Sequence, residues 1–467
     1  DSSNLGLPRH RTVCRAPQRH GCLASQAVPH DAMPVAPRIY NLFPLLAGPI
    51  RNWAALLPNI TAMGFDWVYL NPWHYPGFSG SLYAVKDYDR VHPRLADDTQ
   101  DPKIALKHFL QQAREYGLRV MMDLVINHTS KDALLAHQHP EFYLRDDSGE
   151  LVSPSAIDPA DARKVTVWGD LAELDYRPRT ERSALLGIWK DLLRNSIDLG
   201  FSGFRCDAAY QVPADVWAEL IDYGRKNSHV LFVAETLGGR LEPMKQLASA
   251  GFDAFFNSSK WWDFRQPWLL EQYECFRHLA PSIAFPESHD TPRLIADLAE
   301  QSITDPWRIE AHYRLRYLFA AFFSAGVMMP MGFETGQGKR LDVVRTVPED
   351  LESPRFDLAP FLAAANHLKR DLPVLGEEGP QRLVTASQSP IVGLLRSRDH
   401  GSGRCLALIN PSCTESHSLS ADSLLAQVGQ GWRIVCDSNL GAVEGELKPG
   451  ATVRLHPLAM RVLHSES

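Results

Sequence analysis

The chain has 467 residues and a formal net charge of −7 at pH 7, with 45% hydrophobic and 22% charged residues. This composition is typical of a soluble globular protein, and the length suits a large barrel or sandwich joined to an accessory domain. The charge excludes a basic footprint for nucleic acid or for an anionic membrane surface, and no apolar run approaches the roughly 20 residues of a membrane span.

The pattern of apolar residues changes along the chain. Residues 1–36 are rich in Pro, Arg and His without periodicity, and we expect an irregular N-terminal arm there. From Pro37 onward, short apolar runs alternate with longer amphipathic stretches. The runs predict strands at residues 38–43, 67–73, 118–128, 203–210, 230–236, 252–258, 282–290 and 327–334. The stretches predict helices at residues 53–65, 102–117, 184–200, 213–227, 242–251, 267–279, 308–326 and 358–372.

This alternation predicts an α/β fold, a (β/α)8 TIM barrel over residues 37–375. Strands that read as continuous apolar runs belong to parallel sheets covered on both faces, and eight such units in succession favour a closed barrel. A doubly wound open sheet fits less well, because no Gly-rich phosphate loop follows the first strand. A long insertion after strand 3, at about residues 129–178, is expected to stand over the barrel mouth.

The last part of the chain has a different pattern. Short β-type runs separated by Gly, Ser and Asn follow one another after the last predicted helix. They predict a C-terminal antiparallel domain, a β-sandwich, over residues 376–467.

Polar side chains gather at the C-terminal ends of the predicted barrel strands, the face that holds the active site in such barrels. One Asp at such a position is commonly a turn or helix cap, and Asp290, which precedes Thr291 and Pro292, fits that alternative. Carboxylates at three strand ends, with an Arg inside an apolar strand, fit chance placement poorly. The polar residues are Asp123, Asn127 and His128 on strand 3, Arg205 and Asp207 on strand 4, Glu235 on strand 5, and His289 and Asp290 on strand 7.

This set of residues suits a retaining glycoside hydrolase, which needs two carboxylates about 5 Å apart. Arg205 and Asp207 share one face of their strand, and an adjacent cation favours the ionised carboxylate, so Asp207 is the better nucleophile. Glu235 follows apolar residues and is the better candidate for a raised pKa and acid/base work. Asp290 and His289 would hold sugar hydroxyls and distort the ring.

Five segments carry a resemblance to a known family. "DLVINH", "GFRCDAA", "VAET" and "ESHD" resemble, in order, the four signature segments of the α-amylase family of glycoside hydrolases, and "SLYAVKDY" is similar to its segment after strand 2. The resemblance covers roughly residues 37–467. It implies that Asp207 is the nucleophile, Glu235 the general acid/base and Asp290 the transition-state stabiliser. The substrate-binding residues that we predict alongside them are Arg205, His128, His289, Tyr83, Asp123, Asn127 and Tyr210.

Within this family, "NPWHYPGFSGSLYAVKDY" and "MPMGFE" look most like bacterial maltosyltransferases that use maltose 1-phosphate. That group has large N-terminal domains and an Asn directly after the nucleophile, where this chain has a short arm and Ala208. The common amylases have Lys-His three and four residues after the nucleophile, where this chain has Tyr210 and Gln211. The acceptor side therefore departs from both groups.

We expect a retaining enzyme that acts on α-1,4-linked glucans or malto-oligosaccharides by double displacement, as a hydrolase or a transglycosidase. Two alternatives stay open: a maltosyl or glucosyl transferase with a sugar-phosphate donor, and a non-catalytic carbohydrate-binding member of the fold. The expected partner is an oligo- or polysaccharide, with no nucleic acid and no membrane, and the oligomeric state is undetermined.

Cofactors and location follow from weaker features. Asn127 is a calcium ligand in many amylases of the resembled family, but we predict no cofactor and no metal. The seven cysteines show neither CxxC nor zinc-ligand spacing. The N-terminus lacks the apolar region of a signal peptide, which favours a cytoplasmic location.

Overall fold

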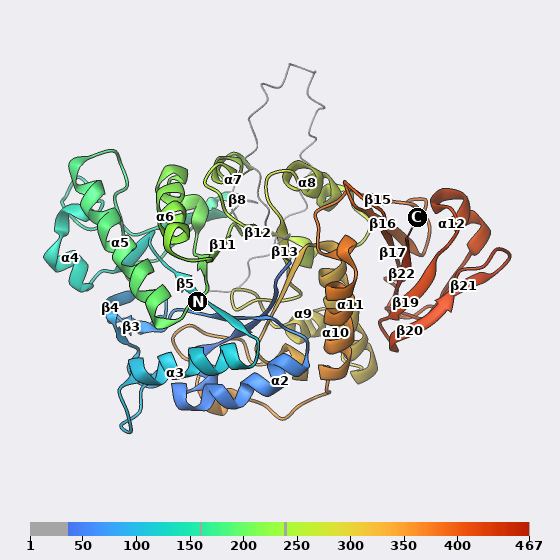
Figure 1. Ribbon diagram of the computed structural model, residues 1–467, viewed down its shortest axis with the longest axis horizontal. Coiled ribbons are helices and arrows are strands. Elements are labelled where there is room, and N and C mark those ends of the chain that lie inside the picture. Colours follow the sequence, from blue (N-terminus) through green and yellow to red (C-terminus); the bar gives the residue numbers. More distant parts are fainter. Residues whose placement is uncertain (1–35, 159–160, 238–240, 467) are drawn as a thin grey trace, which may run out of the picture.

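The computed structural model describes residues 36–158, 161–237 and 241–466. The arm expected at residues 1–36 lies outside the described residues except for Ala36. Eight parallel strands close into a barrel in the order β1-β14-β13-β12-β11-β10-β5-β2 (Figure 1), as the alternating pattern predicts. These strands are β1 (Arg38–Leu42), β2 (Trp67–Leu70), β5 (Arg119–Leu124), β10 (Gly203–Cys206), β11 (Leu231–Ala234), β12 (Ala254–Phe256), β13 (Ser282–Ala284) and β14 (Gly326–Pro330).

Helices connect the barrel strands and cover the barrel from outside. Helix α3 illustrates how the sequence starts them: the Asp101 side chain accepts hydrogen bonds from the backbone N–H groups of Lys103 and Ile104, and Pro102 is the first helical residue. The main helices are α2 (Leu57–Ala62), α3 (Pro102–Glu115), α5 (Thr180–Leu199), α6 (Ala214–Asn227), α7 (Leu241–Ala248), α8 (Trp268–Phe276), α10 (Pro306–Phe323) and α11 (Ala359–Asp371). Shorter ones are α1 (Pro44–Ala47), α4 (Leu134–Gln138) and α9 (Leu294–Glu300).

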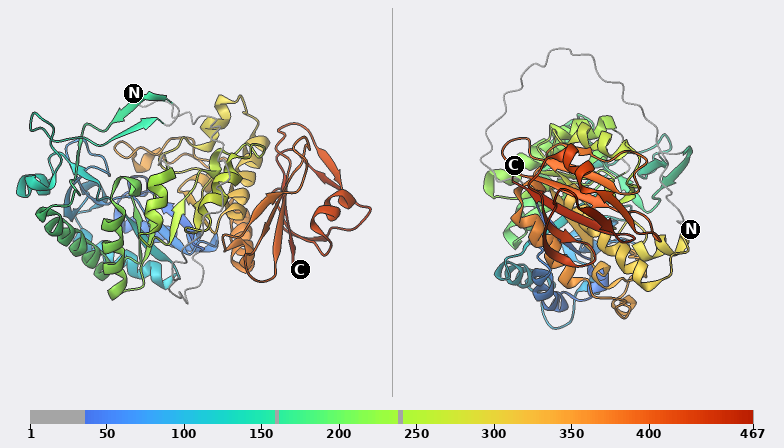
Figure 2. Two further views of the ribbon diagram at one scale, coloured as in Figure 1. Left: turned by 90° about the horizontal axis from the view of Figure 1, so that it is seen from above. Right: turned by 90° about the vertical axis from the view of Figure 1, so that its right-hand side faces the viewer.

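The segment between β5 and α5 has secondary structure of its own. Strand β6 (His128–Ser130) pairs antiparallel with β9 (Leu171–Glu173), and β7 (Ser155–Asp158) pairs with β8 (Asp161–Val167). The β7–β8 pair stands apart from the barrel helices in the left view of Figure 2. After β2, strands β3 (His74–Pro76) and β4 (Val85–Val91) form a hairpin that the sequence did not predict.

The C-terminal part of the chain is built on antiparallel sheets beside α10 and α11 (Figure 1). One sheet has the order β15-β16-β17-β22-β19-β20, and β18 pairs with β21. The polar strands β18 and β20 and helix α12 were not predicted. The elements are β15 (Gln381–Leu383), β16 (Val392–Ser397), β17 (Arg404–Ile409), β18 (His417–Ser420), α12 (Ala421–Val428), β19 (Arg433–Asp437), β20 (Gly441–Glu446), β21 (Thr452–Leu455) and β22 (Met460–Ser465).

Two buried basic side chains bind carbonyl oxygens near the ends of α10 and α11, and one of them, Arg396, belongs to this part of the chain. The Lys369 ammonium donates to three carbonyl oxygens, those of Ala321 (2.9 Å), Ser324 (2.5 Å) and Leu375 (2.7 Å). Arg396 on β16 donates to the carbonyl of Val374 (2.9 Å) and to those of Phe322 and Glu377. The bonds to Ala321, Phe322 and Ser324 satisfy carbonyls at the C-terminal end of α10, which have no partner within the helix.

No helix within residues 36–158, 161–237 and 241–466 is both long enough and apolar enough to span a bilayer.

Candidate active site

The register of strand β10 turns Arg205 into the barrel. Arg205 lies opposite Asp123 of β5 on one side and Val233 of β11 on the other. Its strand neighbours Phe204 and Cys206 point the other way, into the core between barrel and helices. The charged residue in this apolar strand therefore lies on the inner face, where polar groups from other strands can reach it.

Arg205 bridges two carboxylates. Its Nη1 donates to Oδ1 and Oδ2 of Asp123, at 2.8 and 3.0 Å, and to Oδ1 of Asp207 at 2.8 Å. Burial raises the pKa of Asp207, and the Arg205 charge acts in the opposite direction by favouring the ionised form. The guanidinium thus compensates the cost of placing the Asp207 carboxylate in a largely buried position.

Glu235 is a buried carboxyl group directly after β11. Its Oε2 accepts a hydrogen bond from the backbone N–H of Ala208 (3.0 Å), and its Oε1 accepts one from that of Leu237 (2.6 Å). Burial raises its pKa to about 8, against the opposing charge of Arg205, while the negative charges of Asp207 and Asp290 add to the increase. Glu235 is therefore protonated at neutral pH and suited to donate a proton.

His289 connects Tyr83 with Asp290. Its Nε2 lies 2.8 Å from the Tyr83 hydroxyl and 3.1 Å from Oδ2 of Asp290, and the His289 and Tyr83 rings stack at a centroid distance of 5.6 Å. Asp290 is the open member of the site, with 53% of its side chain exposed, and its Oδ2 lies 3.8 Å from Nη2 of Arg205. Burial lowers the pKa of His289 to about 3, so the ring is neutral.

Two further predicted residues lie after β5. His128 is buried, its pKa is lowered to about 4 by burial, and its Nε2 has no hydrogen-bond partner among the described residues. Asn127 donates from Nδ2 to Oε1 of Gln211 at 2.8 Å. That bond links the segment after β5 to the short 3-10 helix that follows Asp207, Ala209–Gln211, which includes Tyr210. Tyr210 is partly exposed. Burial, together with the negative charges of Glu235 and Asp207, raises the pKa of its hydroxyl.

The predicted residues thus meet at one rim, but they lie at different depths. Asp290 and Tyr210 are accessible, whereas Asp123 is 1% exposed. In addition to the bonds from Arg205, Oδ2 of Asp123 accepts 2.6 Å bonds from the hydroxyls of Tyr69 and Tyr83. Oδ2 of Asp123 thus accepts three bonds and Oδ1 one, and its partners among the described residues are Arg205 and the two phenols.

Sequence reasoning missed Tyr69 and Asn71 of the β2 segment. Tyr69 binds Asp123, and the Asn71 amide donates to the hydroxyls of Tyr69 (3.1 Å) and Tyr83 (3.0 Å). Both stand in the run "WVYLNPW", and a phenol and an amide two residues apart within an apolar strand are the same kind of signal that singled out Arg205 and Asp207.

A small cavity of about 220 Å³ opens beside the carboxylates. Glu235, Asp290 and Arg205 line it together with His289 and Ser288, and apolar side chains form the rest of its wall, namely Leu237, Phe256, Phe285 and Met328. This arrangement places charged groups against a low-dielectric surface, where electrostatic interactions are strong.

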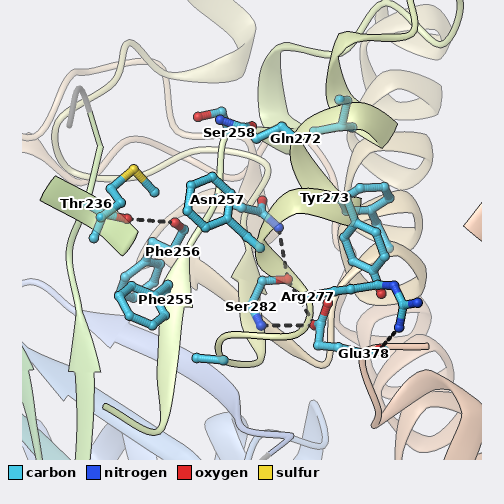
Figure 3. A pocket seen from close by; sticks show the side chains of 15 residues that line it. Thr236, Phe255, Phe256, Asn257, Ser258, Gln272, Tyr273, Arg277, Ser282 and Glu378 are labelled. Atoms are coloured by element: carbon cyan, nitrogen blue, oxygen red, sulfur yellow. Dashed lines mark hydrogen bonds between the residues drawn. The ribbon is translucent and has the colours of Figure 1, made fainter. Parts of the chain in front are cut away.

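A larger cavity of about 630 Å³ lies between strand β12 and helix α8 (Figure 3). Thr236, the residue after Glu235, forms part of its wall, but none of the three carboxylates lines it. Asn257 and Glu378 at this cavity are bound to Ser282 in Figure 3. The larger space is therefore separate from the carboxylate site.

Within residues 36–158, 161–237 and 241–466, no three or more His, Cys, Asp or Glu side chains are grouped so that they could hold a metal ion.

The chain is similar in sequence to known proteins. A family model described as glycogen debranching enzyme, glucanotransferase domain, matches residues 29–158. The chain is 31% identical over 409 residues to an α-1,4-glucan:maltose-1-phosphate maltosyltransferase of Burkholderia pseudomallei, which covers 85% of this chain and 35% of the relative. It is 26% identical over 370 residues to an α-amylase of Haloarcula japonica, covering 71% of this chain and 49% of that one. The chain spans about a third to a half of the length of these two relatives.

Solved structures show the same fold. A maltogenic α-amylase from Thermotoga neapolitana superposes with a TM-score of 0.70 at 20% identity, covering 92% of this chain and 99% of that one. An α-amylase from Geobacillus thermoleovorans, complexed with acarbose, gives 0.72 at 17% identity, covering 92% and 98%. In sequence the chain is thus similar to maltosyltransferases and to an amylase, and its fold is that of solved α-amylases.

Proposed function

We propose that the protein is a retaining enzyme that cleaves α-1,4-linked glucans or malto-oligosaccharides and passes the glycosyl group to water or to another sugar. One observation carries the proposal: Arg205 holds Asp207 at 2.8 Å while the next residue, Ala208, holds Glu235 at 3.0 Å. A carboxylate stabilised by a cation and a protonated carboxyl group are thereby fixed relative to each other, as double displacement requires.

The reaction proceeds in two displacements. Oδ2 of Asp207, which is free of the Arg205 bond, attacks the anomeric carbon as Glu235 protonates the departing glycosidic oxygen. A glycosyl ester on Asp207 forms, and Glu235 becomes ionised. Glu235 then takes a proton from the incoming water or sugar hydroxyl, whose oxygen displaces Asp207 and restores both carboxyl groups.

The remaining groups act on the sugar ring. Asp290, His289, His128 and Tyr83 are candidates to bind its hydroxyls, and neutral His289 and His128 can donate or accept. Charge that develops on the ring during each displacement is stabilised by Asp290, which faces the cavity with Glu235.

A sugar-phosphate donor is the second candidate. The observation in its favour is the similarity to maltosyltransferases named for maltose 1-phosphate. In that reaction phosphate leaves from the anomeric carbon, and the glycosyl ester on Asp207 passes to the end of a glucan chain.

One experiment separates these reactions. The protein is incubated with maltoheptaose, alone and with maltose 1-phosphate, and the products and free phosphate are measured. New reducing ends indicate hydrolysis, a ladder of longer and shorter glucans without donor indicates transglycosylation, and donor-dependent phosphate release indicates the second candidate. If none of the reactions shows turnover, the non-catalytic carbohydrate-binding alternative remains.

The variants for this experiment are Asp207→Asn and a surface control. Asp207→Asn is expected to lower turnover by at least about a thousandfold, because the covalent intermediate cannot form. Asp191→Asn removes an exposed carboxylate that pairs with Arg194 at 2.9 Å, and it is expected to retain activity. Equal activity of the two variants would contradict the assignment of the nucleophile.

A soluble oligo- or polysaccharide is the partner that this activity requires. The cytoplasmic location and the domain limits at about residues 37, 129–178 and 376 remain predictions of the sequence.

A further inference from the structure

Tyr69 is a buried residue of β2 that contacts both members of the central ion pair. It is 0% exposed, its hydroxyl donates to Oδ2 of Asp123 at 2.6 Å, and its ring lies 5.6 Å from the guanidinium carbon of Arg205. Because it is fully covered, it cannot touch a substrate. We infer that Tyr69 is a positioning residue for the reaction, acting on Asp207 through Asp123 and Arg205.

The direction of its hydrogen bond is set from the neighbouring strand. Asn41 of β1 donates from Nδ2 to Oδ1 of Asn71 (2.8 Å) and to the carbonyl oxygen of Tyr69 (3.1 Å). Asn71 in turn donates to the hydroxyl oxygens of Tyr69 and Tyr83. Since the Tyr69 phenol accepts from this amide and a carboxylate can only accept, the single proton of Tyr69 is directed to Asp123.

The chain of contacts then runs outward to the nucleophile. Asp123 accepts hydrogen bonds from two phenol hydroxyls and two from Nη1 of Arg205. The same nitrogen donates to Asp207. The positions of Asp123 and Arg205 therefore depend on how well the carboxylate of Asp123 is satisfied. Buried, charge-assisted hydrogen bonds of this kind are short and geometrically restrictive.

Removal of the Tyr69 hydroxyl changes this balance. Asp123 loses one hydrogen-bond donor and interacts more strongly with Arg205. The guanidinium therefore stabilises the ionised form of Asp207 less. Tyr69→Phe is expected to lower kcat about tenfold, with KM within about twofold, because small displacements of reacting groups are costly while the sugar contacts remain. The acidic limb of the pH profile is expected to move to higher pH.

A matched control is present in the adjacent strand. Tyr40 of β1 is also buried, and its hydroxyl donates to a carboxylate, Oε1 of Glu334, at 2.7 Å, but its ring packs on Phe65 in the outer core. Tyr40→Phe removes the same chemical group from the same kind of pair, so it should cost similar stability and leave kcat and the acidic limb unchanged.

The inference rests on the proposed function for its kinetic arm, so a second arm measures ionisation without turnover. The protein is labelled with ¹³C at the Asp carboxyl carbons, the Asp207 signal is identified by its absence in Asp207→Asn, and it is titrated in each variant. A higher midpoint in Tyr69→Phe than in Tyr40→Phe and wild type supports the inference. Equal midpoints, or an equal kcat loss in both Tyr variants, would overturn it. An inactive wild type with a shifted midpoint would reject the proposed function alone.

Discussion

The backbone N–H of Ala208 donates a 3.0 Å hydrogen bond to Oε2 of Glu235, so the residue that follows Asp207 holds the second carboxyl group of the site. Ala208 does this in the left-handed region, with φ 42° and ψ 45°. Residues other than Gly, Asn and Asp rarely adopt this conformation, which costs about 1–2 kcal/mol. The turn after β10 is therefore locally strained, and in this conformation the N–H group of Ala208 points to Glu235.

Substitutions at Ala208 test this relationship. Ala208→Gly keeps the N–H group and tolerates the conformation, so activity should persist and the free energy of unfolding should change by less than about 1 kcal/mol. Ala208→Val is expected to lower that free energy by about 1–3 kcal/mol and to lower kcat, since a β-branched residue disfavours this φ. Urea unfolding and steady-state kinetics measure both effects. Similar behaviour of the Val and Gly variants would show that the strain is unimportant.

The pH dependence of activity should report Glu235. The general acid must be protonated in the first displacement, and burial raises its pKa to about 8. We expect kcat/KM to fall above about pH 8, with one ionisation on the alkaline side. Profiles between pH 4 and 10 measure this limb. A limb that persists in Glu235→Gln, in whatever residual activity remains, would assign it to another group.

The same group should affect stability in the opposite sense from an ordinary carboxylate. In the folded protein Glu235 stays protonated to higher pH than in the unfolded chain, where its carboxyl group has the ordinary pKa of 4.5. The free energy of unfolding therefore falls as the pH rises from about 4.5 to about 8. Glu235→Gln lacks this loss, and its gain over wild type should grow across that window to on the order of 4 kcal/mol. Denaturant unfolding at several pH values measures the difference; a constant difference would contradict the prediction.

Arg205 should be required for folding as well as for activity. Arg205→Met leaves Asp123 buried without its cation and is expected to cost about 3–5 kcal/mol. Adding Asp123→Asn to that variant removes the unpaired charge and should recover part of the loss. Thermal or urea unfolding of the single and double variants tests this coupling. Simple additivity of the two single effects would show that the pair is not coupled.

The contact between the ends of α10 and α11 depends on Lys369. Lys369→Met leaves the carbonyl oxygens of Ala321, Ser324 and Leu375 without their donor, which is expected to lower the free energy of unfolding by about 3 kcal/mol. Lys448→Met changes an exposed lysine, with 72% of its side chain accessible, and should cost less than about 0.5 kcal/mol. Equal effects of the two substitutions would show that the buried bonds do not stabilise this contact.

Local patterns in the chain were enough to predict the barrel and the candidate carboxylates. Continuous apolar runs indicate strands covered on both faces, and period-3.6 patterns indicate helices covered on one, so the eight strand–helix units could be predicted without knowledge of contacts. Asp207, Glu235 and Asp290 stood out because carboxylates at the ends of apolar strands conflict with burial unless they have a purpose. Polar strands such as β18 and β20 produced no such contrast and were missed.

Tertiary structure decided which groups touch. The opposition of Arg205 and Asp123 comes from the pairing register of β10 with β5, between residues 82 positions apart. The neighbouring strand β2 adds Tyr69, whose hydroxyl binds Asp123 and makes it a buried anchor for Arg205. A sequence specifies the face on which each residue lies, because that depends on local periodicity. Which residues meet on that face, and how deeply each is buried, depends on strand register and barrel closure, and those are set by the whole chain.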